Sequence, residues 1–358
     1  YGAFGIYSNT VNINGGTFMP TTTMSASHPI ALGASGGVIE TPKGVTLTLT
    51  NTITGTNNTL TKNGDGTLVL APSASYGTLI VNGGEVRGQE ASEKHGYPKT
   101  VVLNGGTLRD ADDIYSYSTN STNVEVPEGS TASWYLDSRC SYKGTLTGAG
   151  TLNVYATSTR NSIDGNWNRF AGQLNIGGSK TGSYDPVFLI NNSNGLKNAS
   201  VAANVQINNE GKNVALGNLS GNATLTGKGT WTIGARNEDV KYSGVINGGK
   251  ITKTGSGTWT MSTPQSKVSG NVTVDGGVLN LNNTASNVKF FGNYDVTASG
   301  SGILAGRALL RNVYVNSGAA IQPGNYTSAI PTGTLKTEGS IYCYAGSSAK
   351  FFIYKKGT

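Results

Sequence analysis

The chain is poor in cysteine, histidine and charged residues. Its 358 residues include two cysteines and two histidines, and only 13% of the residues are charged. Two cysteines, Cys140 and Cys343, exclude a disulfide-rich scaffold and a cysteine-based zinc cluster. His28 and His95 lie in polar, loop-like stretches, so neither forms a recognisable catalytic triad.

Long apolar runs and basic clusters are also missing. No apolar stretch reaches 18 residues, so the sequence predicts no membrane-spanning segment. The net charge is +7, but lysine and arginine are scattered singly, which argues against a nucleic-acid partner. Polysaccharide lyases need a base, usually lysine or arginine, beside acidic residues, and polysaccharide hydrolases need a cluster of carboxylates. This chain has only 19 acidic residues. We therefore expect no enzyme active site, no cofactor and no metal site.

What is abundant is glycine, with 52 residues, together with threonine, serine and asparagine. Short apolar runs with alternating pattern separate the turn residues, which predicts an all-β chain. The phrase LTKNGDGTLVL at 60–70 returns as ITKTGSGTWTM at 251–261, and each copy is followed by a strand that ends in Asn-Gly-Gly or Asp-Gly-Gly. Asn-Gly also favours hairpins, but the segments after these turns are too short to pair back. The pattern therefore favours a β-solenoid with about 20 to 25 residues per turn.

This solenoid interpretation makes three structural predictions. Rows of buried residues should stack along the core, one per strand: Leu68, Leu70, Ile80, Leu103, Leu152, Ile176, Ile233 and Leu279. Gly83 and Gly276 lie in corners where glycine can adopt positive φ without steric penalty, and valine at either position should strain the turn if that residue has positive φ. Cys140 and Cys343, many rungs apart, should not form a disulfide, and each should lie in or beside the core.

Three segments resemble a known repeat. Residues 30–86, with their Lys-x-Gly-x-Gly-Thr and Asn-Gly-Gly combination, resemble the passenger-associated β-strand repeat of autotransporter-type proteins. Residues 216–279 look like a second copy, and residues 300–324 are similar to the last repeat of such passengers. The resemblance implies a right-handed parallel β-helix outside or on the surface of a Gram-negative cell, and it carries no catalytic residues. We expect residues 1–358 to form one continuous solenoid, a single elongated rod.

The irregular middle, residues 109–170, departs from the repeat. Its aromatic and arginine residues suggest a carbohydrate-binding platform, because aromatic faces stack on sugars and charged groups bind hydroxyls. The alternative is that large aromatics fill the core and polar residues form loops, which we favour. The candidate ligand-binding residues are Trp134, Tyr135, Arg139, Arg160, Trp167 and Arg169. Asp110, Asp112 and Asp113 have the chemistry of a calcium site but lack a known calcium-loop spacing, so a solvated acidic loop is favoured.

The function expected from the sequence is that of a non-enzymatic, extracellular surface stalk or adhesive passenger. The alternative is an accessory carbohydrate-binding region of a secreted polysaccharide-degrading protein. The expected partners are glycans or a flanking domain of the same polypeptide. A lyase within these residues is a third hypothesis, and it is disfavoured.

Overall fold

The computed structural model describes residues 9–71, 73–88, 96–110, 118–136, 139–157, 161–179, 185–193, 195–265, 267–283, 287–329 and 332–351. The chain divides into two compact units, Tyr1–Leu189 and Ile190–Thr358. Within the described residues the chain forms strands and no helix, and the ladders that join the strands are parallel. The prediction of an all-β parallel solenoid is confirmed. That residues 1–358 form one continuous rod stays a prediction.

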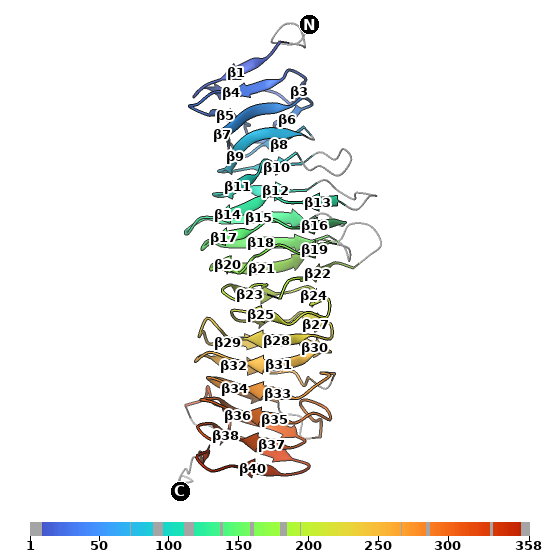
Figure 1. The fold of residues 1–358 in the computed structure, drawn as a ribbon, viewed down its shortest axis with the longest axis vertical. Coiled ribbons are helices and arrows are strands. Elements are labelled where there is room, and N and C mark those ends of the chain that lie inside the picture. Colours follow the sequence, from blue (N-terminus) through green and yellow to red (C-terminus); the bar gives the residue numbers. More distant parts are fainter. Residues whose placement is uncertain are drawn as a thin grey trace. The chain divides into compact units, whose positions relative to one another are not determined.

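Unit 1 is built from successive rungs of short strands (Figure 1). Its first sheet contains β1 (Val11–Ile13), β2 (Thr17–Phe18), β4 (Ile30–Leu32), β5 (Gly37–Glu40), β7 (Ile53–Asn63), β9 (Ala74–Val81), β11 (Thr100–Leu103), β14 (Asn123–Val126), β17 (Leu146–Gly148) and β20 (Arg169–Phe170). Its second contains β3 (Met24–Ala26), β6 (Thr46–Leu49), β8 (Thr67–Val69), β10 (Glu85–Arg87), β12 (Thr107–Arg109), β15 (Thr131–Leu136), β18 (Thr151–Ala156) and β21 (Gln173–Gly178). A third contains β13 (Ser118–Asn120), β16 (Cys140–Tyr142) and β19 (Ser162–Ile163), and β22 (Val187–Leu189) ends the unit.

Unit 2 has the same construction (Figure 1). One sheet contains β23 (Ser200–Ala203), β26 (Ser220–Gly221), β29 (Val240–Tyr242), β32 (Thr258–Met261), β34 (Val278–Asn282), β36 (Ile303–Leu310), β38 (Ala320–Pro323), β39 (Leu335–Thr337) and β41 (Ser348–Ala349). A second contains β24 (Gln206–Asn208), β27 (Thr224–Thr226) and β30 (Val245–Asn247). A third contains β25 (Val214–Leu216), β28 (Thr230–Ile233), β31 (Lys250–Lys253), β33 (Val272–Val274), β35 (Val296–Ala298), β37 (Val313–Val315) and β40 (Ile341–Cys343).

The core consists of columns in which each residue pairs with the equivalent residue of the next rung. Leu47 pairs with Leu68 and Leu68 with Val86, so one rung takes about 20 residues, as the repeat period predicts. The same column continues through Leu108, Trp134, Val154 and Ile176, all of them buried. Strand side chains alternate between faces, so every second residue enters such a column and the others face outward.

Seven of the eight predicted core residues are buried: Leu68, Leu70, Leu103, Leu152, Ile176, Ile233 and Leu279. The prediction for Ile80 is wrong. Ile80 is half-buried, because its neighbours Leu79 and Val81 point inward and the alternation turns Ile80 outward.

The cysteine prediction is confirmed in one part and wrong in another. Cys140 and Cys343 do not form a disulfide, and Cys140 is buried. Cys343, however, is exposed, because it ends β40, a strand whose three residues are all exposed.

The corners do contain a glycine with positive φ, but it is the second glycine of each pair and not the first. In both corners the second glycine has positive φ, with 64° at Gly84 and 56° at Gly277, whereas Gly83 and Gly276 do not. A Cβ atom on Gly84 would collide with the backbone oxygen of Gly66, one rung away. Only glycine therefore fits this second position.

Candidate functional site

The lysine of the repeated phrase occupies a core position in unit 1. Lys62 lies in register between Ile39 and Val81, which both point inward, and its side chain is fully buried. Its Nζ donates hydrogen bonds to the backbone oxygens of Asn63 at 2.9 Å, Gly64 at 2.8 Å and Gly83 at 3.2 Å. Because Gly83 belongs to the next corner, one ammonium group joins two successive rungs. We call this arrangement the lysine clamp.

Unit 2 repeats the clamp with Lys253. This side chain is 1% exposed and lies in a column between Ile233 and Val274. Its Nζ donates to the backbone oxygens of Thr254 at 2.6 Å, Gly255 at 3.3 Å and Gly276 at 3.1 Å. An ammonium group has three donors and no acceptor, so three converging carbonyls satisfy its hydrogen-bonding capacity.

Both clamp lysines titrate below the usual range. Burial lowers the pKa of Lys62 to about 8, although the charges of Asp65 and Glu40 act in the opposite direction. Burial also lowers the pKa of Lys253 to about 8, and Asp239 opposes the shift. No role for these lysines is expected from the sequence motifs. Each lysine follows a buried apolar residue by two positions, Leu60 in one copy and Ile251 in the other. Because strand side chains alternate, this spacing indicates that the lysines point into the core.

The asparagines of the corners form a ladder on the surface. Asn82 Nδ2 donates to Asn63 Oδ1 at 2.9 Å, and Asn104 Nδ2 donates to Asn82 Oδ1 at 3.0 Å. Each Asn of the Asn-Gly-Gly turns at 82–84 and 104–106 therefore bonds to the rung before it. In unit 1 the clamp and this ladder give the lysine, the asparagine and the glycines of the repeat their fixed spacing, whereas Asp275 takes the place of the corner asparagine in unit 2.

Tyr135, one of the predicted sugar-binding residues, lies in a self-stacked column on the outer face of unit 1. Arg109, Tyr135, Tyr155 and Gly177 are in register on β12, β15, β18 and β21. The Arg109 guanidinium lies 3.8 Å from the centre of the Tyr135 ring, and the Tyr135 and Tyr155 rings stack with centroids 4.5 Å apart. Both faces of the Tyr135 ring are therefore covered by the protein's own side chains.

An ion pair with Glu85 holds Arg109, the first residue of this column, in place. Glu85 accepts hydrogen bonds from Arg109 Nε at 3.0 Å and from Arg87 Nη2 at 2.7 Å. Burial raises the pKa of the Glu85 carboxyl, but the two arginines outweigh burial and hold that pKa below its usual range. The arginines are thus engaged within the protein.

The two predicted tryptophans are core residues. Trp134 is 2% exposed and Trp167 is 1% exposed, and their rings stack with centroids 5.8 Å apart. This position agrees with the core-filling alternative, and it corrects the idea that either ring offers an open face to a sugar. Among the predicted arginines, Arg139 is half-buried and Arg169 is exposed, while Arg160 lies outside the described residues. Binding by the arginines stays a prediction.

Asp110 is not a solvated loop residue, which corrects the alternative favoured from the sequence. It is 2% exposed at the end of β12, and its carboxylate accepts a hydrogen bond from the Tyr142 hydroxyl. Asp112 and Asp113 lie outside the described residues. Among the residues that the structure describes, no three His, Cys, Asp or Glu side chains gather as a metal-binding group.

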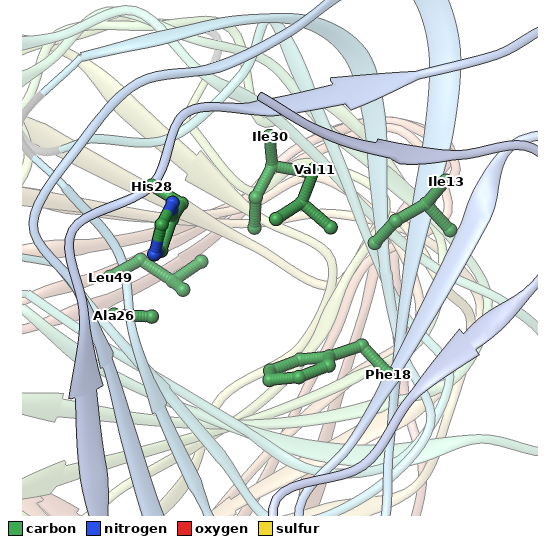
Figure 2. Close-up of a pocket in the computed structure, with 7 residues that line it drawn as sticks. All are labelled: Val11, Ile13, Phe18, Ala26, His28, Ile30 and Leu49. Atoms are coloured by element: carbon green, nitrogen blue, oxygen red, sulfur yellow. The ribbon is translucent and has the colours of Figure 1, made fainter. Parts of the chain in front are cut away.

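An apolar gap lies within the first rungs of unit 1. Figure 2 shows side chains from these rungs around it, with the His28 ring beside Leu49. Its volume is about 10 Å³, which is roughly the room of one water molecule, and its lining is apolar. His28 Nδ1 lies 3.1 Å from the backbone oxygen of Asn9. The gap is a packing defect of the core rather than a ligand site.

In the described part of the chain no helix is long and apolar enough to cross a membrane. Among known proteins, the family model of the passenger-associated-transport-repeat matches the chain twice, at residues 60–87 and 251–281. No curated protein and no solved structure matches the chain significantly. The two matched segments contain the two lysine clamps. The chain therefore carries two passenger-associated transport repeats on a parallel β-solenoid, the architecture of an autotransporter passenger β-helix, and such repeats imply an extracellular or surface-exposed region.

Proposed function

We propose that this chain is a non-enzymatic segment of an extracellular passenger and acts as a surface stalk or an adhesive region. The observation that carries the proposal is the lysine clamp, which recurs in both matched repeats. In each copy a buried ammonium group joins one rung to the next. The lysine that both copies of the phrase share thus stabilises the stacking of rungs, as expected of a scaffold.

The proposed mechanism is geometric. Each rung contacts only its neighbours, so stability is the sum of rung-to-rung interactions. Core columns such as Leu47–Leu68–Val86, the asparagine ladder and the lysine clamps all act across the same rung interfaces. Such a stack resists bending and carries polar side chains on its outer faces, where a partner can reach them.

The alternative, an accessory carbohydrate-binding region, has less support in unit 1 than the sequence suggested. Trp134 and Trp167 are buried, and the Tyr135 ring is covered on both faces. The observation that favours a glycan partner is instead a polar groove in unit 2, which is described below.

Antibodies raised against the purified chain test the localisation. The proposal expects them to label intact cells that produce the protein. Labelling that appears only after the cells are made permeable would contradict an extracellular role.

Incubation with pectin-like polymers tests the non-enzymatic part. We expect no unsaturated uronate absorbance and no release of reducing ends. Either product, at a rate proportional to the protein concentration, would identify an enzyme and overturn this part of the proposal. A polysaccharide pull-down separates a plain stalk from a glycan-binding region, because a plain stalk retains no polysaccharide selectively.

A further inference from the structure

A loop in unit 2 folds back across the outer face of the sheet that contains β29, β32, β34 and β36. The loop follows β38. Gly324 N donates to the backbone oxygen of Gly306 at 2.8 Å, and Asn325 N donates to the backbone oxygen of Thr332 at 3.1 Å. The first bond holds the start of the loop against β36, and the second joins the two ends of the loop, so residues 324–329 form a wall above the strands.

Asn280 anchors this wall. It faces outward on β34 but is fully buried, because the loop covers it. Its Nδ2 donates to Asn325 Oδ1 at 3.0 Å and to Thr260 Oγ1 at 3.2 Å, and its Oδ1 accepts from the Tyr326 amide at 3.1 Å. A buried amide that is satisfied in this way holds the wall in one position.

A groove lies beside the wall, over β29, β32 and β34. Its volume is about 370 Å³, within the range of roughly 300 to 1,000 Å³ that is usual for small-molecule sites. The lining that matters for recognition is polar: Lys241, Ser243, Ser262, Asn282, Asn325 and Thr327. We call this the polar groove. Its lining offers hydroxyls and amides where a drug-like site offers apolar rings, so it suits a ligand rich in hydroxyl groups.

Three side chains of the groove have hydrogen-bonding capacity to spare. Lys241 is exposed and forms no ion pair with a described residue, and the Ser262 hydroxyl has no described partner. Asn282 Oδ1 accepts from Arg307 Nε at 3.0 Å, which fixes the amide and leaves its Nδ2 donor for a ligand. Among the described residues that line the groove there is no carboxylate, so Lys241 is the charged group that faces a ligand there.

We propose that the polar groove binds an acidic saccharide, with Lys241 pairing with the sugar carboxylate and Asn282 and Ser262 bonding to its hydroxyls. Hydrogen bonds from an ammonium to a carboxylate are roughly twice as strong as neutral ones, so the charge selects acidic over neutral sugars. The inference rests on the proposed extracellular role and adds the ligand class of an adhesive region. It describes binding without cleavage.

The test is calorimetric titration of the whole chain with a galacturonate trisaccharide and with a neutral glucose trisaccharide, at low and at high salt. We expect the acidic sugar to bind more tightly than the neutral one, with an advantage that high salt reduces. Lys241→Met should weaken acidic-sugar binding by about five- to tenfold, the loss of one charge-assisted contact. Lys228→Met is the matched control, because Lys228 is also exposed in unit 2 but does not line the groove.

Asn282→Leu is a second variant, and it should weaken both sugars. Circular dichroism spectra that match the wild type establish that the variants fold. The inference is overturned if neither sugar binds the wild-type chain, or if Lys241→Met and Lys228→Met change the affinity equally. If binding fails while antibodies still label intact cells, the groove assignment is lost and the passenger role stands. If labelling is internal, the passenger role itself fails.

Discussion

Gly84→Ala should destabilise unit 1 through a corner that only glycine fits. Gly84 has a φ of 64°, and a residue with a Cβ atom pays roughly 1 to 2 kcal/mol in that region. The new Cβ would also collide with the backbone oxygen of Gly66, which belongs to the preceding corner and is held in the ladder because it accepts a hydrogen bond from Glu85 N at 3.1 Å. We therefore expect a loss of at least about 2 kcal/mol in the free energy of unfolding.

Gly83→Ala is the matched control, one residue earlier in the same corner. Gly83 has no positive φ, and the nearest atom to an added Cβ is the Gly64 oxygen at 3.5 Å, an ordinary contact. Its free energy of unfolding should change by less than about 0.5 kcal/mol. Urea unfolding followed by circular dichroism measures both variants. Equal stabilities for Gly84→Ala and Gly83→Ala would refute the corner geometry described here.

Three further predictions concern titration and thiol access. The pKa of Lys62 is about 8 in the folded chain and about 10.4 in the unfolded chain, so between these values the unfolded chain binds more protons and the free energy of unfolding should rise with pH. Urea titrations of Lys62→Met should show a rise between pH 8 and pH 10 that is smaller than that of the wild type by up to about 2 kcal/mol. Glu85→Gln should cost about 0.5 to 1 kcal/mol at pH 7, and the difference from wild type should vanish in acid, where the wild-type carboxyl is protonated. A thiol reagent should label Cys343 alone in the native protein and Cys140 as well in denaturant, whereas rapid native labelling of Cys140 would contradict its burial.

The fold could be predicted because a solenoid rung is specified locally. Alternation in segments such as 67–70 assigns the inward face, and the repeated phrase gives the period that stacks one rung on the next. Ile80 shows the limit, because a run of apolar residues gives no alternation to read and only the partner strands decide which side faces inward. The choice between Gly83 and Gly84 was equally open, since both glycines satisfy the same turn pattern.

The site was harder to predict because contacts between rungs join residues that are distant in sequence. Tyr135 looks like an exposed ring until Arg109 and Tyr155 are placed on either side of it, one rung before and one after. The polar groove depends on a loop that packs against strand residues far earlier in the chain. Its Asn325 is hydrogen-bonded to Asn280, which lies 45 positions before it. Short-range sequence motifs show neither of these contacts.

The central claim is that the repeated lysine locks two rungs through a buried ammonium. The most direct measurement is ¹⁵N NMR of the side-chain Nζ groups through a pH titration, with Lys62→Met and Lys253→Met used for assignment. We predict two slowly exchanging ammonium signals at neutral pH, one lost in each variant, that both titrate near pH 8. Signals that exchange rapidly and titrate near pH 10.4, as in solvated lysine, would contradict the clamp.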